Sequence, residues 1–309
     1  MTATPLGQAA EEYIAVRRSF GYKLRYHDRL LADFCSWLER AGAHTVSTDA
    51  AVSWAVAPRA SDSWHAERLS AVRGFATYLH VFDPCCEVPP RDLLPAGHRR
   101  VPPHIYSPQE IDALTTQARL LSPPLRAATF DTLIGLLAVT GMRPGEALRL
   151  NRADVDLETG TIKVVATKFN KDRQLALHAT TTAALASYAE LRERCWPQPA
   201  TTSFFVSNTG RRLSHSSLLA TFSRLLDRGG LGPPAGSRGR HPRPMDIRHT
   251  FAVATLLDAY RKDQDVQALL PSLSSWLGHS RPSATYWYLS AVPELLAEAS
   301  QRTQRRRAR

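Results

Sequence analysis

The 309-residue chain carries 39 lysines and arginines against 28 aspartates and glutamates, a formal charge of +11 at pH 7. This excess favours a polyanionic partner, because the field of the protein speeds encounter with one. The sequence has no signal-peptide pattern and no apolar run of membrane-spanning length, so we expect no membrane partner. It also lacks HExxH, a P-loop and a GxGxxG motif after a strand, so we expect no metal or other cofactor.

The four cysteines show no CxxC pair and no spacing typical of a disulfide framework; they are Cys35, Cys85, Cys86 and Cys195. We therefore expect free thiols and a cytoplasmic location, where thiols stay reduced. The length of the chain predicts two domains, together large enough to bury a sizeable core.

Residues 1–83 have the periodicity of a small helical domain. Apolar positions at helical spacing predict helices over residues 8–18 and 26–40. Serine and threonine residues are candidate N-caps for two further helices, namely Ser47 or Thr48 for the third and Ser61 or Ser63 for the fourth.

Basic residues cluster where the first two predicted helices meet. They are Arg17, Arg18, Lys23, Arg25 and Arg29. Such a cluster is either a solvated surface or a set of phosphate contacts that hold a helical domain on DNA without reading bases. The sequence leaves both interpretations open.

Prolines interrupt the helical pattern over residues 84–104, where Arg99 and Arg100 add charge. We interpret this segment as an interdomain linker. Regular structure resumes at Ser107–Glu110, which has the pattern of a capping box with proline at the first helical position. A second domain is therefore predicted over residues 105–309.

The segment Thr140–Glu146 forms a predicted corner between two helices. An apolar helix over residues 130–139 is followed by Gly141, which suits the left-handed conformation at a helix C-terminus. Pro144 suits the first turn of the next helix. Arg143 then lies beside free backbone N–H groups, where a guanidinium can bind a phosphate. The alternative is a surface arginine that caps a turn.

A β-hairpin is predicted after this corner. Period-two alternation indicates strands over residues 161–167 and 173–178, and the tip between them carries Lys168 and Lys171. A hairpin tip is a flexible arm that can bring an ammonium group to a partner. Further along the chain we expect a helix over residues 180–194, a short hairpin over 204–213 and a helix that ends near residue 226.

The last third of the chain is rich in basic residues and histidines. A loop over residues 229–244 carries Arg238, Arg240, His241 and Arg243. The predicted helix over residues 245–260 contains Arg248 and His249. On its own, such a pair is more typical of a helix surface than of a site.

The final segments contain the remaining candidates. The apolar stretch 266–277 is expected to be helical on both sides of a break at Pro271, and His279 follows it. The next predicted helix carries Tyr286 and Tyr288. A last helix starts at Pro293 and ends in a basic tail; it packs either on its own domain or on a neighbouring subunit.

In this order, the motifs resemble the tyrosine recombinase (phage integrase) family. The matching residues are Thr140–Glu146, Lys168, Asp246–Phe251, Leu277–Ser280 and a tyrosine nine positions after His279. The match lies within residues 105–300, and the helical first domain is similar to the family's core-binding, SAM-like domain. No single motif would suffice, but their joint order and spacing are specific.

The resemblance implies roles for particular residues. The catalytic set it implies is Arg143, Lys168, Arg248, His279 and Tyr288. Glu146 matches an acidic residue that orients its neighbours. Tyr286 is the rival nucleophile and Lys171 the rival hairpin lysine.

One position departs from the family pattern. The family usually has a histidine three residues before the second arginine, where this chain has Met245. A thioether cannot donate a strong hydrogen bond. Either His241, His249 or Arg243 supplies that contact, or the site works with one donor fewer, which typically lowers rates roughly a hundred- to a thousand-fold.

The residue types suit phosphodiester transfer. The resemblance implies attack of a tyrosine oxygen on a DNA phosphodiester, which gives a 3′-phosphotyrosyl link and a free 5′-hydroxyl. Cations favour the phenolate of a group whose pKa is ordinarily about 10. Two arginines hold the non-bridging oxygens, and a lysine protonates the leaving oxygen. Fixed cations take the part of a metal, and the covalent bond conserves the phosphodiester energy without ATP.

The fold implied by the resemblance is mainly α (α+β): a helical core-binding domain and a mainly helical catalytic domain with a small antiparallel sheet, together a C-shaped clamp on duplex DNA. The implied function is site-specific recombination by an integrase or transposase of a mobile element. The implied assembly is a homo-oligomer, a dimer to a tetramer on two DNA sites, with accessory proteins as further partners.

Three alternatives remain at this point. A type IB topoisomerase shares the chemistry but relaxes DNA as a monomer. A non-catalytic DNA-binding relative gains support from Met245. A basic RNA-binding helical protein is disfavoured, because no aromatic stacking motif for RNA is visible.

Overall fold

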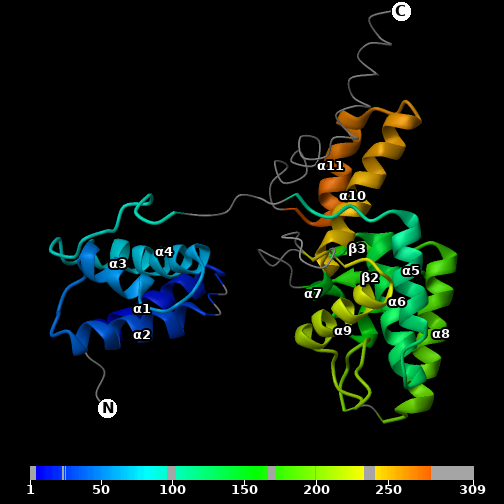
Figure 1. Cartoon of the computed structure of the whole chain (residues 1–309), viewed down its shortest axis with the longest axis horizontal. Helices are drawn as coiled ribbons and strands as arrows, with labels where there is room; N and C mark the ends of the chain where they lie inside the picture. The colour runs from blue at the N-terminus through cyan, green and yellow to red at the C-terminus, as the bar shows by residue number, and fades with distance from the viewer. Residues whose placement is uncertain are drawn as a thin grey trace, which may run out of the picture. The chain divides into compact units, whose positions relative to one another are not determined.

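The computed structural model describes residues 5–22, 24, 26–95, 102–165, 172–198, 200–232 and 241–279. The chain forms two compact units, Met1–Val101 and Pro102–Arg309 (Figure 1). Helices dominate both units, and the second adds a small antiparallel sheet, which confirms the predicted fold class. Within the described ranges, no helix has the length and apolar character needed to cross a bilayer.

Four helices build the described part of the first unit: α1 (Pro5–Ser19), α2 (His27–Arg40), α3 (Thr48–Val56) and α4 (Asp62–Leu79). Their apolar faces meet in a core that includes Phe34, Trp54 and Phe75, each at most 1% exposed. The rings of Phe34 and Trp54 meet edge-on, 5.1 Å between centroids. Ser47 caps α3, as predicted, by accepting a hydrogen bond from the Ala50 N–H at 3.2 Å.

Residues 84–95, which the sequence places in an interdomain linker, lie against the first unit. Cys86 is 2% exposed within the core of that unit. The Arg73 guanidinium on α4 donates to the carbonyls of Pro89 and Pro90, both at 2.7 Å. These contacts give the proline-rich segment a fixed path along α4.

The second unit contains α5 (Pro108–Arg119), α6 (Pro124–Thr140), α7 (Pro144–Ala147), β1 (Val155–Asp156), β2 (Thr161–Val164), β3 (Arg173–Ala176), α8 (Ala179–Cys195), α9 (His215–Arg228), α10 (Pro244–Arg261) and α11 (Val266–Leu277). The strands form an antiparallel sheet in the order β1–β2–β3, in which Ile162 pairs with Val155 and Leu175. α6 packs against α5, α8 and α10 (Figure 1). A helix in that position brings its C-terminus to the candidate site.

Local signals set the start of this unit. The Ser107 hydroxyl accepts from the Glu110 N–H at 3.2 Å, and the Glu110 carboxylate accepts from the Ser107 N–H at 2.7 Å. The capping box predicted from the sequence is therefore present. Ser214 caps α9 in a similar way, accepting from the Ser217 N–H at 3.1 Å.

Three predictions of local structure differ from what the structure shows. α11 runs without a break through Pro271, because this proline lies on the exposed face, where solvent can reach the carbonyl that loses its donor. Residues 204–213 form a single bridge between Val206 and Arg212 rather than two strands. The sequence predicts a helix over residues 145–150 after the corner, but α7 is shorter and ends at Ala147.

Candidate active site

The corner between α6 and α7 depends on Gly141. This residue has φ of 60°, a left-handed conformation that ends α6. A Cβ at this position would lie 2.4 Å from Cδ1 of Phe251 on α10 and 3.1 Å from Cδ2 of Leu277 on α11. Only glycine therefore allows α10 and α11 to approach the end of α6 this closely. Arg143 lies two positions after Gly141, at the N-cap of α7.

Glu146 is the buried carboxylate of this corner, with a side chain 2% exposed. Its oxygens accept from the Arg143 N–H at 3.0 Å and from Nη1 of Arg143 at 2.8 Å. They also accept from Nη2 of Arg173, the first residue of β3, at 2.7 Å. We call Arg143, Glu146 and Arg173 the Glu146 cluster.

The charges of the cluster determine the protonation of Glu146. Burial alone would raise the pKa of this carboxyl, but the hydrogen bond and charge of Arg173, followed by the two hydrogen bonds from Arg143, outweigh it. The pKa of Glu146 falls to about 2, so the group is ionised at neutral pH. The carboxylate can therefore hold both guanidiniums at once.

The end of α11 is fastened to the end of α6 by side-chain donors. Arg248 donates from Nη1 to the Gly141 carbonyl at 3.0 Å and from Nη2 to the Leu277 carbonyl at 2.7 Å. Arg143 donates from Nη2 to the Gly278 carbonyl at 3.4 Å. Both arginines therefore meet at the C-terminus of α11, although they are far apart in the sequence.

His279 lies directly beyond this helix end, half-buried. Burial lowers the pKa of its imidazole to about 4, and the charges of Arg248 and Arg143, followed by His249 and Arg173, act in the same direction. The ring is thus neutral at physiological pH, with one nitrogen able to accept a proton.

The structure brings four predicted residues together: Arg143, Glu146, Arg248 and His279. Met245 is half-buried in the first turn of α10. The charge of His249, on the same helix, lowers the pKa of His279. His241 and Arg243 are exposed. The remaining candidates lie outside the described residues: Lys168, Lys171, Tyr286, Tyr288, Lys23, Arg25, Arg99, Arg100, Arg238 and Arg240.

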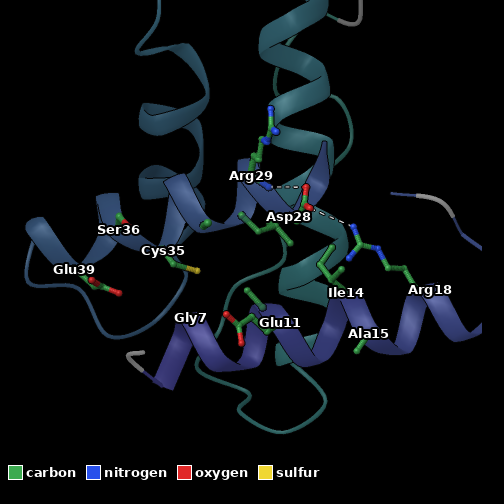
Figure 2. Close-up of a pocket in the computed structure, with 13 residues that line it drawn as sticks. Gly7, Glu11, Ile14, Ala15, Arg18, Asp28, Arg29, Cys35, Ser36 and Glu39 are labelled. Carbon is green, nitrogen blue, oxygen red and sulfur yellow. Dashed lines mark hydrogen bonds and ion pairs between the residues drawn. The ribbon is translucent and has the colours of Figure 1, made fainter. Parts of the chain in front are cut away.

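Three residues of the basic cluster at the junction of α1 and α2 are described: Arg17 is half-buried, and Arg18 and Arg29 are exposed. Arg17 stacks over the ring of Tyr22, 3.8 Å from the centroid. Arg18 donates to Asp28 at 3.3 Å, and both side chains are nearly half exposed, at 47% and 46%. Figure 2 shows this pair at one end of a groove of about 690 Å³ between α1 and α2, which Arg29 also lines. Arg18 and Arg29 are accessible, as a phosphate contact requires.

The sequence interpretation missed Arg173, which it treated only as the start of a strand. No sequence signal identifies it, because its partner Glu146 lies 27 positions earlier in the chain and its contact with Arg173 appears only in the fold. Within the described residues, no group of three histidine, cysteine or acidic side chains is arranged to hold a metal ion.

Residues 106–294 match the sequence profile of the phage integrase family. The chain belongs to this family. Of its relatives, the integrase/recombinase (by name) y4rB of Sinorhizobium fredii is 41% identical over 306 residues, covering 97% of each chain. Tyrosine recombinase XerC of Azotobacter vinelandii is 31% identical and covers 72% of this chain and 68% of its own. Tyrosine recombinases are enzymes of site-specific DNA recombination.

Solved structures of other recombinases share the fold of this integrase-family chain. The Tn1549 transposon integrase, in complex with transposon right end DNA, has a TM-score of 0.68 at 15% identity, covering 98% of this chain and 99% of its own. The XerH recombinase bound to a palindromic difH substrate has a TM-score of 0.65 at 18% identity, covering 90% and 78%. At these identities the likeness concerns the fold alone.

Proposed function

We propose that this integrase-family protein cuts and rejoins duplex DNA at a specific site through a covalent 3′-phosphotyrosyl intermediate. The observation that carries the proposal is the meeting of Arg143, Arg248 and a neutral His279 at the C-terminus of α11. Two fixed cations beside an uncharged imidazole suit a phosphodiester that gains negative charge as it reacts.

The two arginines are suited to hold the scissile phosphate. Each guanidinium presents several N–H donors in a plane, and contacts to backbone carbonyls hold both head groups at the end of α11. The backbone contacts fix the position of each head group before DNA arrives. Donors that need no reorganisation stabilise the transition state more than mobile ones do.

The remaining steps concern proton transfer. We assign Tyr288 as the nucleophile: its oxygen forms the bond to phosphorus while the bond to the 5′ oxygen breaks. Neutral His279 can accept the phenol proton or donate a hydrogen bond to the phosphate. We assign Lys168 as the donor that protonates the 5′ oxygen. The tyrosine thus loses one proton, and the leaving oxygen gains one from the lysine.

The nature of the relatives supports duplex DNA as the substrate and a mobile element as the setting. The Tn1549 integrase and XerH are described in complex with DNA. The net charge of +11 suits the same partner. We propose assembly as a tetramer on two sites, formed through dimers, with integration or transposition as the outcome.

Trapping of the covalent complex tests the proposal. A duplex selected by binding from random sequence, with a nick near its centre, loses the short 5′-hydroxyl strand after cleavage and retains the protein. Peptide mapping should find the DNA on Tyr288, and an adduct on Tyr286 would refute that assignment. Arg143→Ala and Arg248→Ala should each slow adduct formation roughly a hundred- to a thousand-fold. Arg194→Ala, at the exposed end of α8, is the matched control.

Met245 is the observation that favours a second candidate, a DNA-binding relative without cleavage activity. Footprinting on the selected site with no adduct under any condition would support it. Supercoil relaxation without recombinant products would instead indicate a type IB topoisomerase activity.

A further inference from the structure

Arg173 is the third guanidinium of the candidate site, beside those of Arg143 and Arg248. It begins β3, where it pairs with Val164 of β2. Its side chain is 11% exposed and donates from Nη2 and Nη1 to the two Glu146 oxygens at 2.7 and 3.4 Å. Arg143, on the same carboxylate, is 31% exposed. Arg173 therefore approaches Glu146 from the buried side, and Arg143 from the open side.

The charge balance of the Glu146 cluster depends on Arg173. A single carboxylate facing only Arg143 would offset the positive charge that Arg143 needs to bind a phosphate. With Arg173 present, the three groups carry a net charge of +1. The buried carboxylate then positions Arg143 without cancelling its charge.

Arg173 also lies under the end of α11. A Cβ on Gly278 would come within 2.7 Å of Nη1 of Arg173, so the two groups are in close contact. Gly278 has φ of 66°, and its carbonyl accepts from Arg143. One side chain thus supports both the carboxylate that holds Arg143 and the peptide that precedes His279.

We propose that Arg173 is a positioning residue for DNA cleavage, which neutralises Glu146 so that Arg143 keeps its charge for the scissile phosphate. This inference rests on the proposed function. Arg173 does not touch the reacting atoms in this scheme. It acts through Glu146 and Arg143.

The test is single-turnover formation of the covalent adduct on the nicked duplex. Arg173→Gln should slow the cleavage step roughly a hundred-fold, the typical result of misplacing a catalytic group. DNA affinity should change no more than about three-fold, because one phosphate among many is affected. Arg173→Lys loses the two-point contact but keeps the positive charge that the proposal requires beside Glu146, and should stay within about ten-fold of the wild type.

The double variant Glu146→Gln with Arg173→Gln separates a charge role from a merely structural one. It removes the negative charge together with its neutraliser, so it should recover at least about ten-fold over Arg173→Gln alone. Loss of packing would instead make the double variant as slow as Arg173→Gln or slower. Lowering the pH toward 5 should likewise narrow the deficit of Arg173→Gln, since Glu146 without Arg173 protonates more easily.

Arg212→Gln is the matched control. Arg212 is half-buried in the same unit and donates to the Leu148 carbonyl at 2.8 Å and to the Asn151 side chain at 2.6 Å, rather than to the Glu146 carboxylate. If Arg173→Gln cleaves as fast as this control, or the double variant shows no recovery, or Arg173→Lys is as slow as Arg173→Gln, the inference alone is overturned. A wild-type protein that forms no adduct would overturn the proposed function and this inference together.

Discussion

Each unit of the molecule contains a carboxylate bonded to arginine, and the two differ in burial. Glu146 is 2% exposed between Arg143 and Arg173, whereas Asp28 is 46% exposed beside Arg18. The exposed pair is screened by solvent, and its geometry is easily lost. Removal of a member of the buried cluster costs more, because the remaining charges stay out of water and lose part of their compensation. The same kind of ion pair therefore has a fixed geometry at Glu146 in the second unit and a changeable geometry at Asp28 in the first.

Removal of each carboxylate gives the largest expected contrast. Glu146→Ala leaves two partly buried guanidiniums without their acceptor, and we expect a loss of about 3–5 kcal/mol in the free energy of unfolding. Asp28→Ala should leave that free energy close to the wild-type value. Urea denaturation of both variants measures the difference, and equal effects would remove the distinction between the two regions.

Acid should weaken the buried carboxylate in a definite pH window. The pKa of Glu146 is about 2 in the folded chain, below its ordinary value of 4.5. Because the folded value is the lower one, the stabilisation is complete above about pH 4.5 and is lost as pH falls through 2, a change of about 3 kcal/mol. The gap in unfolding free energy between wild type and Glu146→Gln should shrink over that range. A gap independent of pH would contradict the assigned ionisation.

Two left-handed glycines extend the contrast to the backbone. Gly141→Ala combines the left-handed cost with overlap against Phe251, and should destabilise the chain by about 2–3 kcal/mol. Gly42, at φ of 68° after α2, has no atom within 4 Å of an added Cβ. Gly42→Ala should therefore cost only about 1–2 kcal/mol, from conformation alone. Thermal melts of both variants give the comparison.

His279 should titrate well below an ordinary histidine. Its depressed pKa means that the folded chain resists protonation until the pH falls to about 4. Ring C–H resonances of His279 in the free protein, identified by their absence in His279→Gln, should shift with a midpoint near that value. A midpoint near 6.5 would show that burial and the nearby arginines do not control this ring.

The smallest expected effect concerns the exposed surface of the first unit. Arg18→Ala should leave the unfolding free energy unchanged and weaken DNA binding a few-fold. The slope of the logarithm of the binding constant against the logarithm of salt concentration should fall by about one. Titrations at several salt concentrations measure both quantities. Arg40→Ala, at the other end of α2, serves as the control. A salt dependence identical to wild type would show that Arg18 makes no phosphate contact.

The sequence by itself determined the local features of this protein. The capping box at Ser107 and the helix end at Gly141 depend on hydrogen bonds and backbone angles within about four residues, so their signals are contiguous. For the cap of α3 the sequence left two adjacent candidates, of which the structure has Ser47. The order of the motifs also sufficed to identify the family and to place Arg143, Arg248 and His279 in one site.

Only the tertiary structure decided which charged groups lie together and which groups are buried. Arg173 bonds to Glu146, which lies 27 positions earlier in the sequence. The pattern of a strand does not indicate which distant residue its first side chain contacts. The neutral state of His279 depends on burial and on arginines from three other elements. The continuity of α11 through Pro271 depends on which face of the helix meets solvent. Charge and burial act through space, whereas sequence patterns report neighbours along the chain.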